Sequence, residues 1–506
     1  MKKGDILDLE ISGYAFEGKG IAKIVKEVRS AEEEPKKFVV FVEGAYPGDI
    51  LSAQVGKIRK SYAEARIKNL HVASSLRTEA ACKHFGTCGG CKAQNLSYEH
   101  QAKFKEEQVK DIFERLGGLK DFELLPIVSA VKIYFYRNKL EYSFADKRWL
   151  SESEISSMQE IPDRNFALGF HIPGMYDKVL NIEECHLQSD SSNQILNLTR
   201  KFFKDRNISI YSTKTHEGFL RNLVIKQASN TNDLMVNLVV SEENDELLSD
   251  YKESLLREVP AITTIIFNIS KKKASIAIGD YEIVSHGGGF IIDKIGKSKY
   301  RISANSFFQT NTSQAEKLYN VGLDFAEFSG NEIVYDLYSG AGTIPIFISE
   351  KVKQIYGFES VEPAIQDALV NRELNSVSNF EPILADLNKS FLPIVEQKNL
   401  PSPDVIITDP PRSGMHAKTV QDILVLSPAK IVYISCNPAT QARDVKLLCD
   451  GGYELVKVQP VDMFPHTYHV ETLPFLLRAK SKYPEFTNAL FRAFCLTLAS
   501  RFKLKH

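Results

Sequence analysis

Ile431-Val-Tyr-Ile-Ser-Cys-Asn-Pro438 is the stretch that decides the fold of this chain. Its β-branched and aromatic residues predict a short buried strand that ends just before Cys436. Open α/β sheets bind ligands at the carboxyl ends of their strands, which places this cysteine where chemistry takes place. A lone cysteine after a strand is more often a small buried apolar residue. A chemical role therefore depends on the motifs around it.

Strands and helices alternate on both sides of this stretch, from Glu332 onward. Such alternation predicts a largely parallel, doubly wound α/β sheet, to which the last two strands could add an antiparallel edge. The expected strands are Ile333–Leu337, Gln354–Phe358, Pro382–Leu384, Asp404–Thr408, Ile431–Ile434, Glu454–Pro460 and Pro474–Leu477. The expected helices are Thr343–Glu350, Pro363–Leu374, Lys418–Leu426 and Ala439–Cys449.

A glycine turn follows the first of these strands, and it favours a nucleotide-like cofactor. Gly340 and Gly342 let the backbone approach a ligand closely, just before a helix begins. Glu359 ends the next strand, about 20 residues on, where an acid hydrogen-bonds a ribose. Pro345 stands where a dinucleotide site has its third glycine. The pattern therefore speaks against NAD and fits S-adenosylmethionine, which has no pyrophosphate.

Two further motifs supply carboxyl groups near the strand ends. Asp409-Pro-Pro-Arg412 follows a strand that its prolines cannot extend, so Asp409 is presented to the crevice, although a structural turn is the plainer alternative. Met463-Phe-Pro-His-Thr-Tyr-His-Val-Glu471 lies between the last two strands. Its histidines and Glu471 could mimic a metal site, but a general base at Glu471 is the sharper interpretation.

A cluster of cysteines lies far upstream, in a glycine-rich loop with the spacing C-x5-C-x2-C. A fourth cysteine is found about a hundred residues later, and four thiolates suit either zinc or an iron–sulfur cluster. Three clustered cysteines with one distant cysteine favour an iron–sulfur cluster over zinc. The alternative to both is that these are unliganded core cysteines. The candidate ligands are Cys82, Cys88, Cys91 and Cys185, whereas Cys449 and Cys495 are expected to be packing residues.

The first seventy residues predict a small OB-like β-barrel. Glycine-rich or acidic turns, such as Ala31–Pro35, separate short segments of strand character between Asp5 and Leu70. A cluster of cations could form a basic patch for nucleic acid on one rim, and a solvated strand face is about equally plausible from charge alone. These cations are Lys57, Arg59, Lys60, Arg66 and Lys68.

The composition bounds the class of protein. At 506 residues the chain suggests about two to four domains, and its 43% hydrophobic and 25% charged residues are typical of a globular protein. A formal net charge of −1 means that any basic site is local. Lys2 and Lys3 do not lead into a secretory signal, and no run of about 18 apolar residues could span a bilayer. We expect a cytoplasmic protein that does not associate with a membrane.

The motifs together resemble the RNA 5-methyluridine methyltransferases, a family that modifies C5 of uracil with S-adenosylmethionine. The resemblance rests on Ser435-Cys-Asn-Pro438, Asp409-Pro-Pro-Arg412, the glycine turn, Phe308-Gln-Thr-Asn311, and Pro465-His-Thr467 with Glu471. The barrel resembles a TRAM domain, an RNA-binding module. With the cysteines added, the chain is most similar to the bacterial 23S rRNA branch that carries a [4Fe–4S] cluster.

The resemblance implies a multidomain fold. Residues 1–71 would form the TRAM-like barrel, 72–95 and 120–302 a central α+β iron–sulfur domain, 96–119 and 303–480 a Rossmann-like class I methyltransferase, and 481–506 a C-terminal extension. In this arrangement the helix expected at Leu96–Leu116 packs with the catalytic domain. We hypothesise that the cluster braces the RNA-binding domain.

The resemblance also implies roles for single residues. Cys436 would be the nucleophile, Glu471 the base, and the four candidate cysteines would hold the cluster. Thr343 occupies a position that is often Asn in the family, and His186 one that is often Pro. The residues implied to contact the cofactor are Gln309, Tyr338, Gly340, Thr343, Glu359, Asp386 and Asp409.

The chemistry fits these residue types independently. C5 of uracil is too weak a nucleophile to attack a methyl sulfonium, so a thiolate must first add at C6. Cysteine is suited because it is strongly nucleophilic and later leaves readily. A base such as Glu471 must then remove the C5 proton. A stacked uracil has to be flipped out or presented in a loop, and Phe307 is available to stack on it.

Alternatives remain within and outside this chemistry. The substrate could be the T-loop uridine of tRNA, or two rRNA sites, in place of one uridine in 23S rRNA. A noncatalytic RNA-binding iron–sulfur protein is another class, which the joint presence of Cys436 and Glu471 disfavours. A methylthiotransferase would have its TRAM domain last and a C-x3-C-x2-C loop. No obligate protein partner is indicated.

Overall fold

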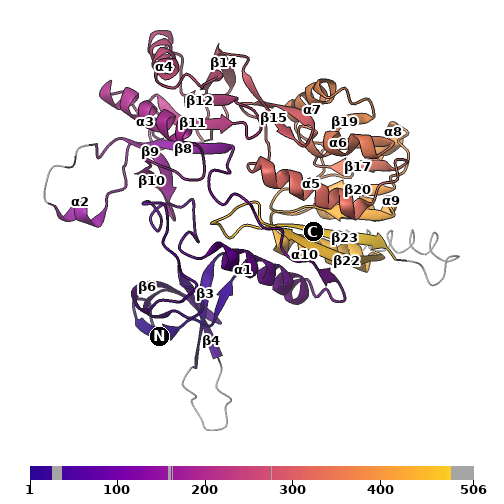
Figure 1. Cartoon of the computed structure of the whole chain (residues 1–506), viewed down its shortest axis with the longest axis horizontal. Coiled ribbons are helices and arrows are strands. Elements are labelled where there is room, and N and C mark those ends of the chain that lie inside the picture. Colours follow the sequence, from indigo (N-terminus) through magenta and orange to yellow (C-terminus); the bar gives the residue numbers. More distant parts are fainter. Residues whose placement is uncertain (26–36, 158–160, 162, 275, 480–506) are drawn as a thin grey trace, which may run out of the picture.

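The computed structural model describes residues 1–25, 37–157, 161, 163–274 and 276–479. Figure 1 shows a small barrel at the bottom, a sheet with two helices at the upper left, and an α/β sandwich at the right. Helix α1 (Tyr98–Asp111) lies between the barrel and the sandwich. The expected turn at Ala31–Pro35 and the extension 481–506 with Cys495 lie outside the described residues.

The N-terminal barrel forms because its strands alternate buried apolar and exposed polar side chains. Val40, Val42 and Leu51 are fully buried in its core. Its strands run in the order β1-β5-β6-β4-β3-β2, with β4 and β6 parallel and the other pairs antiparallel. The strands are β1 (Ile6–Glu10), β2 (Gly13–Ala15), β3 (Lys19–Val25), β4 (Lys37–Glu43), β5 (Ile50–Ile58) and β6 (Tyr62–Val72).

The central part is a mostly antiparallel sheet in the order β10-β9-β8-β11-β12-β13-β14. Its middle strands are buried on both faces, because helices α3 and α4 cover one side and the rest of the chain the other. The elements are β8 (Lys139–Ala145), α2 (Glu152–Ser156), β9 (Ala167–Ile172), β10 (Met175–Asn181), α3 (Asp190–Asp205), β11 (Leu220–Gln227), β12 (Leu234–Val240), α4 (Asp245–Glu258), β13 (Thr264–Ile269) and β14 (Tyr281–His286).

A hairpin of β15 (Phe290–Ile295) and β16 (Ser298–Ser303) leads from this sheet to the C-terminal sandwich. The sandwich sheet has the order β19-β18-β17-β20-β21-β23-β22-β7, in which β23 is antiparallel to both of its neighbours. Its strands are β17 (Ile333–Leu337), β18 (Gln354–Glu359), β19 (Phe380–Leu384), β20 (Val405–Thr408), β21 (Lys430–Tyr433), β22 (Tyr453–Val461) and β23 (Glu471–Arg478).

Helices pack on both faces of this sheet, which produces two apolar layers. They are α5 (Thr312–Ala326), α6 (Thr343–Ile348), η2 (Ser349–Lys351), α7 (Glu362–Leu374), α8 (Leu392–Gln397), α9 (Ala417–Leu426) and α10 (Pro438–Asp450). The strands and helices that the sequence predicts here are confirmed, with ends shifted by three residues at most. Glu471 differs from the expectation, because it is the first residue of β23 and not a loop residue.

Two segments from before the central sheet pack with the sandwich. Helix α1 continues as the π-helical turn η1 (Ile112–Leu116), which contacts α10. The short strand β7 (Glu123–Leu124) then extends the sandwich sheet by pairing with β22. From the sequence we expected the chain to pass from the sandwich to the central domain at residue 120. It leaves the sandwich only after β7, which ends at Leu124.

No helix in the described ranges is long and apolar enough to cross a membrane.

Candidate active site

Cys436 and Glu471 come together because two strands of opposite direction meet at one edge of the sheet. Ser435 follows β21 and exchanges two backbone hydrogen bonds with Thr472 of β23, of 3.1 and 2.9 Å. In an antiparallel pair the next residues, Cys436 and Glu471, then face each other on the same side. The parallel strand β21 ends where the antiparallel strand β23 begins, so a base distant in sequence lies opposite the thiol.

Arg412 is the cation that faces the thiol. Burial raises the pKa of Cys436 to about 11, nearby Glu471 adds to this, and the Arg412 guanidinium lowers it through its charge and a hydrogen bond. The Arg412 Nη2 also lies 3.2 and 3.1 Å from the two ring nitrogens of His469. Burial and Arg412 lower the pKa of His469 to about 4, so its ring is neutral at pH 7. A neutral ring can accept a hydrogen bond from Arg412.

A pair of carboxyl groups lies beside the thiol, of which Glu471 is buried and Asp409 half-buried. Burial raises the pKa of Asp409 to about 7, and burial together with Asp409 raises the pKa of Glu471 well above its usual range. The side-chain amide of Gln309 donates to Asp409 Oδ2 over 3.4 Å. A carboxyl group with a raised pKa keeps its proton at a pH where a solvent-exposed carboxyl group has lost it. When it is ionised, it is a stronger base than an exposed carboxylate.

A cavity of about 1370 Å³ begins at these residues and runs along the carboxyl ends of β17, β18 and β20. Its position at the point where the strand order reverses is the one that doubly wound sheets use for ligands. The predicted residues that line it are Gln309, Tyr338, Gly340, Thr343, Glu359, Asp409, Cys436 and Glu471. The exposed Phe307 and the half-buried Phe464 line it as well.

Glu359 ties together the two loops that border the cavity. Its carboxylate accepts hydrogen bonds from the backbone of Gly340 at 3.0 Å and of Val361 at 2.9 Å. Tyr338 and Gly340 have left-handed backbones, with φ of 67° and 53°, and a Cβ on Gly340 would meet no heavy atom within 4 Å. The glycine is therefore required by its turn and leaves the space above it open.

The cavity fits a polar nucleoside cofactor. The hydroxyl of Ser339, which lines it, is buried and has no hydrogen-bond partner among the described residues. Thr343 lies at the base, with its hydroxyl 3.2 Å from that of Tyr319. Asp386 does not line the cavity, because it is exposed and pairs with Lys389 at 3.1 Å. The nearby Asn388 lines the cavity.

The sequence did not indicate the partnership of Arg412 with Cys436 and His469. Arg412 and His469 stand in motifs that the sequence singled out, but they are 57 positions apart and nothing in the sequence indicates that they touch. Only the sheet order, which brings β20 and the start of β23 to either side of β21, makes this contact predictable.

All four candidate cysteine ligands line one small cavity of about 120 Å³. Its other walls are largely apolar and include Phe85, Leu140, Phe170 and Ile182. Within the described part of the chain, no group of three or more His, Cys, Asp or Glu side chains is arranged to hold a metal ion. The cysteines therefore surround a space rather than converge on a point.

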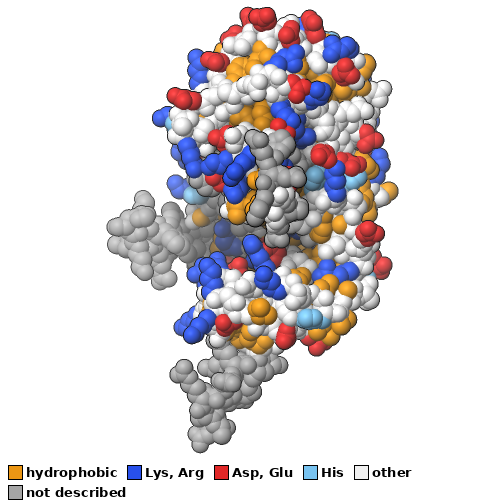
Figure 2. Space-filling view, turned by 90° about the vertical axis from the view of Figure 1, so that its left-hand side faces the viewer, with side chains coloured by type: hydrophobic (Ala, Val, Ile, Leu, Met, Phe, Trp, Pro, Cys, Tyr) orange, Lys and Arg blue, Asp and Glu red, His pale blue; other side chains and the backbone are white. Residues whose placement is uncertain are grey.

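A groove of about 1360 Å³ separates the barrel from the central sheet, and the cysteine loop forms part of its wall. Figure 2 shows Lys and Arg side chains on both sides of the hollow above the barrel. The lining cations are Lys19, Arg66, Lys83, Lys92 and Arg148. Each has a carboxylate within 4.0 Å, and Arg66 and Lys92 share Glu43, at 3.5 and 3.6 Å.

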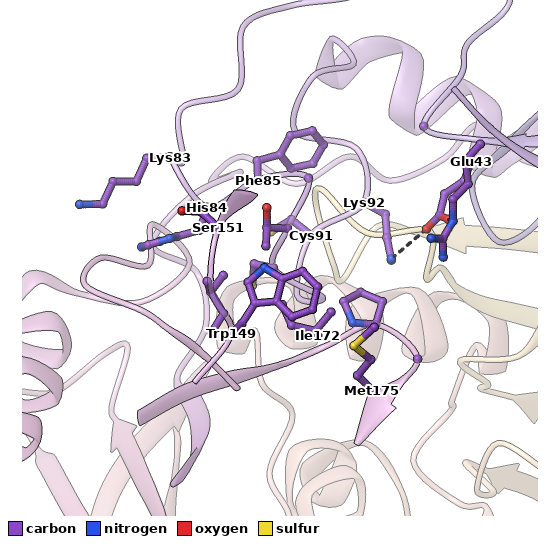
Figure 3. Close-up of a pocket in the computed structure, with 18 of the residues that line it drawn as sticks. Glu43, Lys83, His84, Phe85, Cys91, Lys92, Trp149, Ser151, Ile172 and Met175 are labelled. Atoms are coloured by element: carbon purple, nitrogen blue, oxygen red, sulfur yellow. Dashed lines mark ion pairs between the residues drawn. The ribbon is translucent and has the colours of Figure 1, made fainter. Parts of the chain in front are cut away.

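Trp149, the single tryptophan of the chain, lines this groove together with Phe85, Ile172 and Met175 (Figure 3). Lys178 Nζ lies 5.4 Å from the centre of its ring. Tyr468 lines the same groove, and its ring centre lies 4.2 Å from that of His469. The groove therefore reaches the side chains that surround Cys436.

The strand order, the glycine turn after β17 and the cofactor-sized cavity define a Rossmann-like methyltransferase that carries an N-terminal barrel. Comparison with known families agrees. The tRNA (Uracil-5-)-methyltransferase family matches residues 231–479, and the TRAM domain matches residues 1–68.

Whole-length relatives extend the match. An uncharacterized RNA methyltransferase of Chlorobaculum tepidum is 41% identical over 482 residues, which are 95% of this chain and 98% of that protein. Another from Bacteroides thetaiotaomicron is 42% identical over 466 residues, 91% of this chain and 99% of that protein. The chain therefore belongs to the tRNA (uracil-5-)-methyltransferase family of RNA methyltransferases, which use S-adenosylmethionine.

A solved structure shares the whole architecture. The tRNA (uracil-54, C5)-methyltransferase of Pyrococcus abyssi, in complex with S-adenosyl-L-homocysteine, covers 93% of this chain and all of its own, with 27% identity and a TM-score of 0.69. The expected TRAM domain and methyltransferase fold are thus confirmed.

Proposed function

We propose that this chain methylates C5 of a uridine in 23S rRNA through a covalent bond between Cys436 and C6 of the base. The observation that carries the mechanism is the placement of Cys436 opposite Glu471, with Arg412 at the thiol and the cofactor-sized cavity beside them. These groups are the ones that C5 alkylation requires.

The steps follow from the chemistry of each side chain. Arg412 stabilises the thiolate of Cys436, which adds to C6, so that an S–C6 bond forms and the electron pair moves onto C5 and the C4 carbonyl. S-adenosylmethionine supplies the electrophilic methyl group when bound. Glu471 then takes the proton from C5, the S–C6 bond breaks, and the C5=C6 double bond returns with the thiolate released.

The cofactor would be held by the residues that line the cavity. Gly340 and Glu359 at the ends of β17 and β18 would be its polar contacts, together with Gln309 just before α5 and Thr343 at the start of α6. Asp409 lines the same cavity as the thiol and contributes to the raised pKa of both Cys436 and Glu471, so we place it beside the target base.

The four cysteines would hold a [4Fe–4S] cluster. The fit rests on a small, mostly apolar space lined by four thiols, which suits a group larger than a single ion. In this role the cluster braces the loop that forms one wall of the groove. It takes no part in the transfer of the methyl group.

The groove would hold the RNA that flanks the target. Its cations are exposed or half-buried and their ion pairs are worth only about 0–1 kcal/mol each, so phosphates can replace the carboxylates. Trp149 offers a ring on which a base can stack.

A tRNA uridine is the second candidate. The Pyrococcus abyssi tRNA enzyme shares the architecture of the whole chain, so the barrel and overall fold do not separate the two substrates. The cysteine loop is the feature that favours 23S rRNA.

The test uses 5-fluorouridine, whose fluorine cannot leave as the C5 proton does. Wild type and Cys436→Ala are each incubated with S-adenosylmethionine and with 23S rRNA fragments or tRNA that carry this base. A covalent band on a denaturing gel for wild type with rRNA alone supports the proposal. A band with tRNA alone selects the second candidate, and no band from folded, cofactor-binding protein contradicts both.

A further inference from the structure

His466 occupies a backbone conformation that is uncommon for a residue with a Cβ. Its φ is 65°, in the left-handed region, although it is neither glycine nor asparagine. Such a residue costs about 1–3 kcal/mol and persists only where its surroundings hold it. It is buried in the loop between β22 and β23, three residues before His469.

Two separate parts of the chain hold this residue. From the cysteine loop, the backbone N–H groups of Lys92 and Ala93 both donate to the His466 carbonyl, at 2.8 and 3.1 Å. From helix α1, the Gln101 side-chain oxygen accepts the His466 N–H at 2.8 Å. Both the backbone N–H and the backbone carbonyl of His466 are therefore held by hydrogen bonds.

The ring is fixed as well. It stacks on Tyr134, with centres 4.4 Å apart and planes 30° apart. Tyr134 in turn meets His186, the residue after Cys185, edge-on at 6.2 Å. Two residues further along the chain, Tyr136 donates its hydroxyl to the carbonyl of Pro465 at 3.0 Å. The segment beside the cysteines thus holds the loop by side chains as well as by backbone.

The loop carries this fixed geometry to the thiol. Thr467 donates its hydroxyl to the Phe464 carbonyl at 2.8 Å and accepts the His469 N–H at 3.2 Å. His469 contacts Arg412, which hydrogen-bonds Cys436. A rigid path therefore leads from the cysteine loop to the cation that faces the nucleophile.

We propose that His466, held by Tyr134 and the cysteine loop, is a positioning residue that sets Arg412 against the Cys436 thiol. The inference rests on the proposed function, because it concerns the addition of that thiol to the base. Tyr134 is the residue to change, since it is only half-buried and its loss leaves the backbone hydrogen bonds intact. Tyr134→Phe keeps the ring stack and is the matched control.

The measurement is the rate at which the full-length protein forms the covalent adduct with 5-fluorouridine RNA, as a function of pH. Tyr134→Ala should slow the adduct at neutral pH by up to about tenfold, the size that an aromatic pair allows, and should regain wild-type rates at higher pH. Tyr134→Phe should match wild type.

A second comparison separates positioning from simple loss of structure. In an Arg412→Met background, Tyr134→Ala should cause no further loss, because both changes act through the same cation. Additive losses, or a rate deficit that is the same at every pH, would overturn the inference. Failure of wild type to form any adduct would instead overturn the proposed function.

Discussion

Ser435 and Thr472 exchange backbone hydrogen bonds of 3.1 and 2.9 Å, and this exchange sets Cys436 across from Glu471. The carboxyl group acts after the methyl group has been transferred, when the C5 proton must leave. Glu471→Gln keeps the shape and removes the base, so we expect one methyl transfer and then a trapped adduct on ordinary uridine RNA. A labelled RNA retained on the protein in a denaturing gel checks this. Wild-type turnover by the variant would contradict the assignment.

The thiol should react faster as pH rises. Its pKa is raised to about 11, so below that value each pH unit increases the thiolate fraction about tenfold. Arg412 lowers this pKa, and its removal in Arg412→Met should move the whole profile to higher pH and slow the reaction at pH 8. The rate of iodoacetamide alkylation of the Cys436 peptide, followed by mass spectrometry, measures this. A profile unchanged by the substitution would show that Arg412 does not act on the thiol.

The sequence predicted the α/β sheet well because its signals are local. A strand such as Ile333–Leu337 is a run of apolar residues that needs no distant partner to be recognised, and its ends are marked by a glycine turn. The placement of Cys436 just after a strand followed from the same kind of local signal, whereas Glu471 was expected in a loop and is the first residue of β23.

Contacts between distant segments were not predictable in this way. The pairing of β7 with β22 and the burial of helix α1 against the loop before β23 join positions more than 300 apart in the chain. Asp386 shows another limit of local signals: it lies two residues after β19, at the expected edge, and its exposed side chain pairs with Lys389. Side-chain direction depends on neighbours that one sequence does not reveal.

Trp149 should contribute to RNA affinity and not to cofactor binding. If a base stacks on its ring, Trp149→Ala should weaken RNA binding by about 1–3 kcal/mol, and Trp149→Phe should retain most of the affinity. Filter binding with the rRNA fragment measures the first effect, and titration with S-adenosylhomocysteine provides the control. Equal RNA affinity of wild type and Trp149→Ala would exclude this groove as the path of the RNA.

Lys105 and Asp462 form a buried ion pair of 2.7 Å that joins helix α1 to the loop before β23. Lys105 also donates to the Phe464 carbonyl at 3.0 Å, and Asp462 accepts the hydroxyl of Tyr98 at 2.9 Å. Loss of one partner leaves a buried charge unpaired, so Lys105→Met should cost about 3–5 kcal/mol of local stability. The matched change Lys110→Met, on the exposed face of the same helix, removes a pair of 4.0 Å and should cost at most about 1 kcal/mol.

Hydrogen–deuterium exchange of residues 462–470 distinguishes these outcomes, because local opening of the loop exposes its amides. We expect Lys105→Met to lose protection there, and Lys105→Met combined with Asp462→Asn to regain part of it, since the second change removes the stranded charge. Equal exchange in the two lysine variants would mean that the buried pair does not hold the loop. Loss of protection spread evenly over the chain would point to global unfolding, and the role of helix α1 in fixing the loop that carries His469 would then have to be abandoned.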